Sequence, residues 1–203
     1  MAISTDLSTV SVVAATSLEA RAVRRELPNV RVHETGVALA RVSASTLGDA
    51  VISCGLAGGL RTDLGTGTVL VPTQVRTPSG EMLPCDDALV AALIDGARRL
   101  GHEPVTAPLI TSSTIVRGTE RAVWAERGYA GVDMESGLIT APRMAVIRVV
   151  LDTPLRELSA DWLRPATAFL RPKNWPEAWW LAREAPRAAQ LAARVLRVAL
   201  EHR

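Results

Sequence analysis

The sequence of 203 residues has little of what a metal centre or a disulfide framework requires. It contains only two cysteines, Cys54 and Cys85, without C-x-x-C spacing, and three histidines, His33, His102 and His202. A structural zinc site needs four such ligands in a recognisable pattern, so we expect no metal site. The first residues lack a charged region followed by an apolar run of the signal-peptide kind. We therefore expect a reduced, cytoplasmic protein without disulfides.

The sequence also lacks a concentration of one charge and lacks long hydrophobic runs. It has 23 basic and 21 acidic residues, a formal net charge of +2, and arginines in both halves. A nucleic-acid-binding face needs a concentrated basic patch, so we expect no nucleic-acid partner. No window approaches the ~20 apolar residues of a membrane span. With 48% hydrophobic residues the chain can build one sizeable core, and we expect a single domain over residues 1–203.

What the sequence does contain is an alternation of buried strands and helices. Apolar, largely β-branched runs predict strands covered on both faces at 10–15, 50–54 and 144–152. Helical spacing and capping residues predict helices after Thr16, over Asp86–Gly101, over Thr119–Arg127 and through a C-terminal segment from about residue 157. Residues 31–44 predict a strand or hairpin, and residues 130–140 a strand entering a helix. This alternation predicts an α/β fold with three α/β/α layers and a central mixed sheet.

Three acidic residues follow predicted strands. Glu19 follows the first strand, Glu135 follows "AGVDM", and Asp152 ends "VIRVVL". Ligands gather at the carboxyl ends of strands in α/β sheets, so these three are candidates for one site. Burial at a strand end lets a carboxyl group keep a proton, whereas a nearby arginine such as Arg148 opposes this, and the sequence leaves the balance open. Taken singly, Glu19 is explained as a first-turn helix acid and Asp152 as a turn acid.

Four segments in order resemble the nucleoside phosphorylase and nucleosidase superfamily of the purine-nucleoside-phosphorylase type. They are "VVAATSLEA", "VISCGLAGGLRTDLGTGTVLVP", "VDMES" and "IRVVLD". The resemblance implies a nucleoside-phosphorylase-like fold and cleavage of the N-ribosidic bond of a purine nucleoside. That reaction builds oxocarbenium character on the sugar, and the base has to be protonated as it leaves. Carboxyl groups then perform all the steps, and we expect no cofactor.

The resemblance also implies a role for each acid. Asp152 would protonate the purine, and Glu135 would accept hydrogen bonds from the ribose hydroxyls. Glu19 would orient or deprotonate the attacking water. Met134 would pack against the sugar, with Asp133 in support. The implied substrate-binding residues are Ala57, Gly58, Ile115, Val116, Asp133, Met134, Glu135 and Arg148.

The segment "GLAGGL" predicts a glycine-rich loop whose N–H groups line a base pocket or bind phosphate. A phosphorylase would use inorganic phosphate as co-substrate and needs arginine beside such amides. Arg41, Arg61 and Arg117 are candidates, but no arginine precedes Gly55, where related phosphate-using enzymes carry one. Glu19 takes the place of the hydrolases' acid. These features favour hydrolysis over phosphorolysis.

Two positions differ from methylthioadenosine nucleosidases: Ile115 replaces a phenylalanine, and Leu151 replaces a serine before the catalytic aspartate. The C-terminal segment "LSADWLRPATAFLRPKNWPEAWWLAREAPRAAQLAARVL" resembles that of hopanoid-associated phosphorylases, also called adenosylhopane nucleosidases. This resemblance implies release of adenine from an adenosylhopane-like, 5′-substituted adenosine. The alternatives are a phosphate-dependent purine nucleoside phosphorylase, a methylthioadenosine/S-adenosylhomocysteine nucleosidase, a futalosine hydrolase and a non-enzymatic nucleoside-binding sensor.

The expected partners are a small-molecule nucleoside and a second copy of the chain in a homodimer. The C-terminal aromatic residues offer an apolar wall for a hydrocarbon substituent, or a peripheral contact with a membrane. We expect most of them to pack the last helix against the sheet or to bury a dimer interface. These residues are Trp162, Phe169, Trp175, Trp179 and Trp180.

Overall fold

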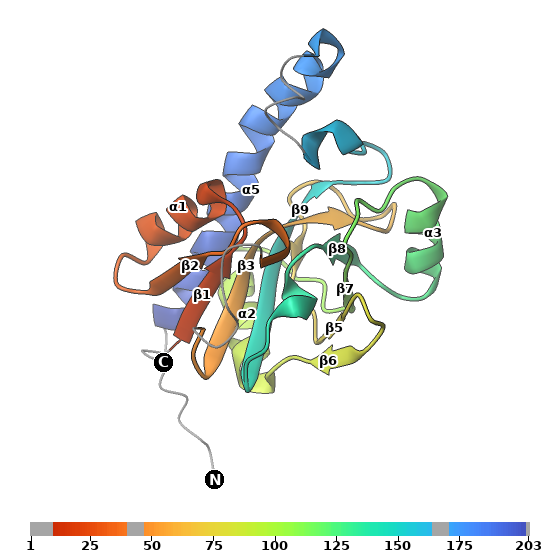
Figure 1. The fold of residues 1–203 in the computed structure, drawn as a ribbon. Helices are drawn as coiled ribbons and strands as arrows, with labels where there is room; N and C mark the ends of the chain where they lie inside the picture. Colours follow the sequence, from red (N-terminus) through yellow and green to blue (C-terminus); the bar gives the residue numbers. More distant parts are fainter. Residues whose placement is uncertain (1–9, 40–46, 164–170, 202–203) are drawn as a thin grey trace.

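The computed structural model describes residues 10–39, 47–163 and 171–201. Its centre is a nine-stranded mixed sheet with the path β2-β1-β3-β8-β7-β5-β6, and β9 pairs with both β3 and β4 (Figure 1). The strands are β1 Val10–Ala14, β2 Arg31–Glu34, β3 Ala50–Gly59, β4 Val69–Leu70, β5 Gln74–Arg76, β6 Met82–Pro84, β7 Leu109–Thr111, β8 Gly131–Asp133 and β9 Arg143–Asp152. The predicted α/β class with a central mixed sheet is confirmed.

Strand β3 has three strand partners. It runs parallel to β1, and parallel to β9 as far as Ala57, where the register with β9 shifts. Beyond the shift, Gly58 and Gly59 pair antiparallel with β8. Every residue of β1 is buried, and so is every residue of β9 after Arg143, as their β-branched apolar composition predicts. The ends of β1, β3, β8 and β9 therefore meet in one region.

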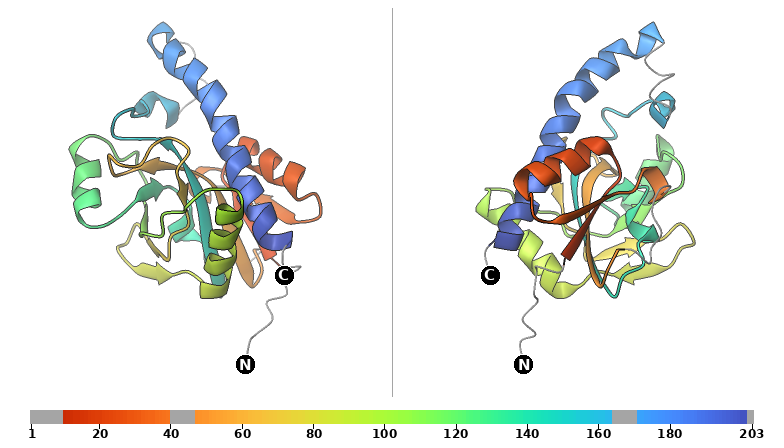
Figure 2. Two further views of the ribbon diagram at one scale, coloured as in Figure 1. Left: turned by 180° about the vertical axis from the view of Figure 1, so that it is seen from behind. Right: turned by 60° about the vertical axis from the view of Figure 1, so that its left-hand side comes forward.

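The helices α1 Ser17–Glu26, α2 Asp87–Arg99 and α5 Trp175–Glu201 form one layer, because α5 packs against both of the others and against β3 and β9 (Figures 1 and 2). Gly96 lets α2 approach α5 closely: a Cβ there would lie 2.7 Å from the carbonyl oxygen of Val195. Helix α3 Thr119–Glu126 lies at the far end of the sheet from α1. Single 3-10 turns complete the fold: η2 Val37–Leu39, η4 Ser136–Leu138, η5 Ala160–Leu163 and η6 Pro172–Asn174.

Three predicted elements differ in the structure. The strand or hairpin over 31–44 is β2 followed by η2, and residues 40–46 lie outside the described part. The helix expected after Glu135 is only the single turn η4. The helical segment expected from about residue 157, with breaks at its prolines, consists of the short 3-10 turns η5 and η6 followed by the long helix α5 from Trp175, and residues 164–170 lie outside the described part. Pro176 stands in the first turn of α5, where a missing N–H costs nothing.

Two of the C-terminal aromatic residues do not pack against the sheet. Trp175 is 58% exposed and Trp179 is 80% exposed, so the predicted packing against the sheet is wrong for both. Trp180 stacks under Arg156, whose guanidinium carbon lies 4.4 Å from the ring centroid. Phe169 lies outside the described residues. None of the helices in 10–39, 47–163 and 171–201 combines the length and apolarity that a bilayer crossing requires.

Candidate active site

A cavity of about 270 Å³ opens where β1, β3, β8 and β9 end. Its lining contains the three predicted acids Glu19, Glu135 and Asp152, contributed by three separate segments of the chain. The remainder of the lining is mainly apolar. Of the predicted site residues, the cavity brings together Glu19, Ala57, Gly58, Ile115, Val116, Asp133, Met134, Glu135 and Asp152.

Glu19 is fixed by two sets of hydrogen bonds. It is the third residue of a capping box with Thr16: its Oε2 accepts from the Thr16 N–H at 2.8 Å and from the Thr16 hydroxyl at 2.7 Å. Its Oε1 accepts from the N–H of Leu56 in β3 at 2.8 Å. The carboxyl group therefore stabilises the start of α1 and also lines the cavity, so the helix-cap explanation holds and the catalytic role stays a prediction.

Glycine in β3 permits these close approaches. A Cβ on Gly55 would lie 2.3 Å from Oε1 of Glu19, and a Cβ on Gly58 would lie 3.1 Å from Oδ1 of Asp152. The predicted glycine-rich loop is wrong here, because both glycines belong to the strand. Neither has a positive φ. The absent side chains, rather than a turn, are what the site uses.

Asp152 ends β9 and pairs with Arg121 of α3. Arg121 is 2% exposed, and it donates from Nη1 to the Gly59 carbonyl at 2.7 Å and from Nε to the Val116 carbonyl at 3.0 Å. Its Nη2 donates to Oδ2 of Asp152, which also accepts from the Leu158 N–H at 3.4 Å. Asp152 therefore does not lie in purely apolar surroundings, and the arginine that faces it is Arg121, not Arg148.

Arg148 is the one predicted site residue that does not line the cavity, and substrate binding by it stays a prediction. It is buried beneath the site, where Nη2 lies 2.9 Å from Oδ2 of Asp133 and 3.8 Å from Oε2 of Glu135. The same nitrogen donates to the Ser53 hydroxyl at 2.6 Å. The network holds Asp133 in place, which agrees with a supporting position for this residue.

Glu135 has the most perturbed carboxyl group of the cavity. Burial, together with the negative charge of Asp133, raises the pKa of Glu135 to about 7, although Arg148 opposes the shift. Its Oε2 accepts a hydrogen bond from the Met134 N–H at 3.3 Å. Burial and a neighbouring carboxylate therefore favour the protonated form of Glu135, while Asp133 pairs with Arg148 and accepts a hydrogen bond from the Thr111 hydroxyl.

The sequence did not identify Arg121 as part of the site. It lies on a short helix of weak amphipathic character, and no spacing distinguishes it from the other arginines. The apolar lining residues Val37, Leu56, Leu151 and Leu158 were not identified as such either, because only the chain path brings them together.

The arginines proposed for phosphate lie elsewhere. Arg61 pairs with Asp63, Arg117 lies 3.7 Å from Glu157, and neither lines the cavity. Arg41 lies outside the described residues. Within the described part of the chain, the one cationic side chain in the lining is Arg121, which Asp152 and Glu157 already neutralise. No group of three or more potential metal ligands occurs among the same residues.

Comparison with known proteins gives a family model and a set of similar folds. The model described as "Phosphorylase superfamily" matches residues 32–197. No curated protein sequence matches the chain. A 5′-methylthioadenosine/S-adenosylhomocysteine nucleosidase from Neisseria meningitidis, in complex with methylthio-immucillin-A, superposes with a TM-score of 0.74 at 18% identity, covering 96% of this chain and 99% of that one.

Two Helicobacter pylori structures are also similar. A mutant nucleosidase with 5′-methylthioadenosine in its active site gives a TM-score of 0.74 at 13% identity, over 96% of this chain and 99% of that one. A futalosine hydrolase mutant gives 0.71 at 13% identity, with the same coverage. At these identities the likeness concerns the fold.

Proposed function

The chain belongs to the phosphorylase superfamily, and on that premise we propose that it is a nucleosidase that hydrolyses the N-glycosidic bond of a 5′-substituted adenosine and releases adenine. The observation that carries the proposal is the meeting of Glu19, Glu135 and Asp152 around one largely apolar cavity. Similar folds belong to proteins whose names state nucleosidase activity on methylthioadenosine and on S-adenosylhomocysteine.

In this proposal Asp152 protonates the departing base. Because Arg121 and the Leu158 N–H occupy Oδ2, the oxygen directed past Gly58 toward the cavity is Oδ1. As the bond between C1′ and the purine nitrogen breaks, its electron pair passes to the base. Oδ1 of Asp152 takes up a proton from solvent and passes it to the base, while Oδ2 stays paired with Arg121, so the base leaves as neutral adenine.

Glu135 and Glu19 act on the sugar side. Glu135, with Met134 beside it, accepts hydrogen bonds from the ribose hydroxyls in its ionised form. Glu19 is held by Thr16 and Leu56 and accepts a proton from the attacking water, whose oxygen forms the new bond to C1′. Fixed carboxyl positions of this kind lower the cost of orienting the reactants.

Hydrolysis is better supported than phosphorolysis. A phosphate ion would require a cation that is free to bind it, and Arg121 already serves two carboxylates. Inorganic phosphate would be the co-substrate in the alternative reaction. No metal or organic cofactor is part of the proposal, because the carboxyl groups supply the proton transfers.

We further propose that the 5′ substituent is apolar, as in adenosylhopane. The resemblance of the C-terminal segment to adenosylhopane nucleosidases and the apolar cavity lining of Val37, Leu56, Ile115 and Leu158 support this. A single domain over residues 1–203, a homodimer and a cytoplasmic location stay predictions.

The test is to incubate the purified protein with adenosines carrying hydrogen, methylthio or long alkylthio groups at the 5′ carbon and to measure free adenine by chromatography. Hydrolysis predicts adenine release without phosphate and formation of the free sugar. A strict need for phosphate would establish the phosphorylase instead, and binding without release would establish a sensor.

The variant Asp152→Asn should lose adenine release by at least about a hundredfold, and unchanged turnover would remove Asp152 from the mechanism.

A further inference from the structure

Helix α5 consists of two halves with different surroundings. All of its buried residues lie between Ala188 and Ala199, where the helix packs against the sheet, α1 and α2. From Trp175 to Arg187 no side chain is buried. In all three views this first half projects beyond the body of the protein (Figures 1 and 2). We call residues 171–187 the α5 tip.

The α5 tip exposes aromatic surface. Trp175 and Trp179 are four residues apart, so their side chains lie on the same face of the helix. They are among the most exposed large apolar side chains in the described part of the chain. Exposed apolar surface of this kind marks a contact site rather than an ordinary solvated helix.

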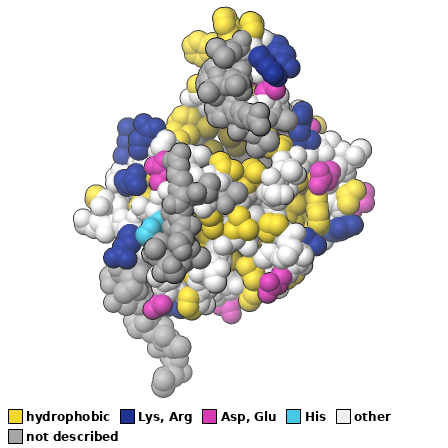
Figure 3. All heavy atoms as spheres, in the orientation of Figure 1, with side chains coloured by type: hydrophobic (Ala, Val, Ile, Leu, Met, Phe, Trp, Pro, Cys, Tyr) yellow, Lys and Arg dark blue, Asp and Glu magenta, His cyan; other side chains and the backbone are white. Residues whose placement is uncertain are grey.

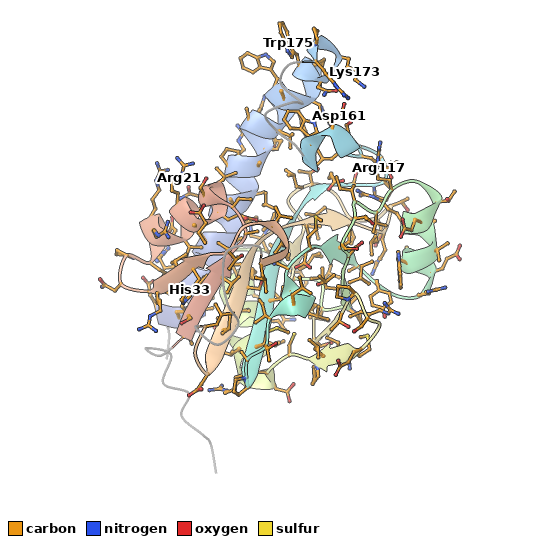
Figure 4. The ribbon with its side chains drawn as sticks, in the orientation of Figure 1. Arg21, His33, Arg117, Asp161, Lys173 and Trp175 are labelled. Carbon is orange, nitrogen blue, oxygen red and sulfur yellow. The ribbon has the colours of Figure 1, made fainter. Side chains whose placement is uncertain are left out.

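The tip also carries exposed basic side chains, and Arg183 and Arg187 continue the four-residue spacing of Trp175 and Trp179 along α5. The side chains of Arg171, Lys173, Arg183 and Arg187 are between 55% and 70% exposed. The acids that pair with them, Asp161 and Glu184, are only 21% and 25% exposed. Positive charge therefore faces outward at the same end of the helix as the tryptophans, and Figures 3 and 4 show Lys173 and Trp175 both reaching outward from this end.

We propose that the α5 tip docks on an anionic lipid surface. Tryptophan favours the boundary between headgroups and hydrocarbon, and each Lys or Arg near an anionic leaflet adds attraction. A second copy of the chain is the less favourable occupant. Symmetric pairing of two tips would bring the same basic side chains together, which costs free energy.

The tip is connected to the lining of the cavity. The Ser159 N–H donates to Oε1 of Glu177 in the first turn of α5 at 2.7 Å, and Arg156 stacks on Trp180. Between these contacts lies Leu158, which lines the cavity. A docked tip therefore brings this part of the cavity lining toward the lipid surface. The further consequence, that an apolar nucleoside enters from the membrane, rests on the proposed function.

The experiment is co-sedimentation of the full chain with vesicles of phosphatidylcholine alone and of phosphatidylcholine mixed with phosphatidylglycerol. Binding is expected only to the mixed vesicles, and it should weaken as salt is added. The double variant Trp175→Ser/Trp179→Ser should weaken binding by at least about tenfold, and Lys173→Glu/Arg183→Glu by at least about fivefold. Val123→Ser is the matched control, because Val123 is 43% exposed on α3, away from the tip.

Each outcome is decisive. Absence of binding, equal binding to both vesicle types, or unchanged binding of the tryptophan variant would overturn the proposal. Dimerisation that depends on the two tryptophans, without vesicle binding, would assign the tip to a second copy. Adenine release from methylthioadenosine in solution separates this inference from the proposed function: the tryptophan variant should keep that activity, and a protein that binds vesicles but cleaves no nucleoside would refute only the function.

Discussion

The buried pair of Arg121 and Asp152 should give strongly non-additive effects on stability. Both side chains are almost fully buried, at 2% and 8% exposure. The perturbation is a double-mutant cycle of Arg121→Met, Asp152→Asn and the double variant. Arg121→Met removes the guanidinium but keeps an unbranched side chain of similar length, so it tests the charge more than the volume.

The three variants leave different groups without partners. Arg121→Met leaves a buried carboxylate with only the Leu158 N–H as donor, and it also removes the donors to the Gly59 and Val116 carbonyls. Loss of one partner of a buried ion pair costs about 3–5 kcal/mol. Asp152→Asn costs less, about 1–2 kcal/mol, because Oε1 of Glu157 still lies 3.4 Å from Nε of Arg121.

The double variant has no orphaned carboxylate at position 152 and no buried guanidinium. The loss in its free energy of unfolding should therefore be smaller than the sum of the two single losses, by at least about 2 kcal/mol. The assay is urea unfolding followed by circular dichroism for all four proteins, with equal m-values as the condition for comparison. If the two single effects add within about 0.5 kcal/mol, the two groups are not coupled and the described role of Arg121 is wrong.

Three further predictions concern glycines and pH. Gly55→Ala should displace Glu19 and reduce adenine release at least about tenfold. The control Gly65→Ala, whose Cβ would have nothing within 4 Å, should leave adenine release unchanged. Equal rates of adenine release in the two variants would contradict the role of Gly55. Gly96→Ala should lower the free energy of unfolding in urea by about 1–3 kcal/mol, because its Cβ meets the α5 backbone, and an unchanged midpoint would refute the close packing. The pKa of Glu135 is raised from 4.5, the value for an unfolded chain, to about 7 in the folded protein. The folded state therefore binds this proton more tightly, which stabilises it by about 3 kcal/mol at pH values below 4.5. This stabilisation is lost as the pH rises through 7. Glu135→Gln should therefore flatten the pH dependence of urea midpoints between about pH 5 and pH 8, and parallel curves would contradict the shift.

Much of the sheet and the meeting of the three acids could be predicted from local patterns. The runs at β1, β3 and β9 are buried and β-branched, and carboxyl ends of neighbouring parallel strands lie together. Glu19 follows β1 and Asp152 ends β9, both of which run parallel to β3, so their convergence needed no knowledge of distant contacts. Glu135 lies with them although β8 runs antiparallel to β3. Ala57, Gly58 and Met134, which the family resemblance implied, also line the cavity.

The partner of Asp152 could not be predicted in this way. Arg148 lies on the same strand as Asp152 and was the local candidate. The arginine that pairs with Asp152 is instead Arg121 of α3, 31 residues earlier in the sequence. This pair depends on how α3 packs against the strand ends, and the spacing of apolar residues in the sequence does not predict that packing. The exposure of Trp175 and Trp179 could not be predicted for a related reason. Tryptophan in an amphipathic helix is usually buried, and the sequence does not show whether another surface lies beside it.

Strand β3 supports three acids of the cavity: the Leu56 N–H donates to Glu19, Gly58 leaves room for Asp152, and Ser53 accepts from the arginine beneath Glu135. One stretch of six residues thus holds three functional groups through a backbone N–H, a missing side chain and a hydroxyl. In a saturation mutagenesis screen, Ser53–Gly58 should tolerate fewer replacements than any equally long surface segment. Diversification of substrate preference would then have to occur in the segments that face β3 across the cavity.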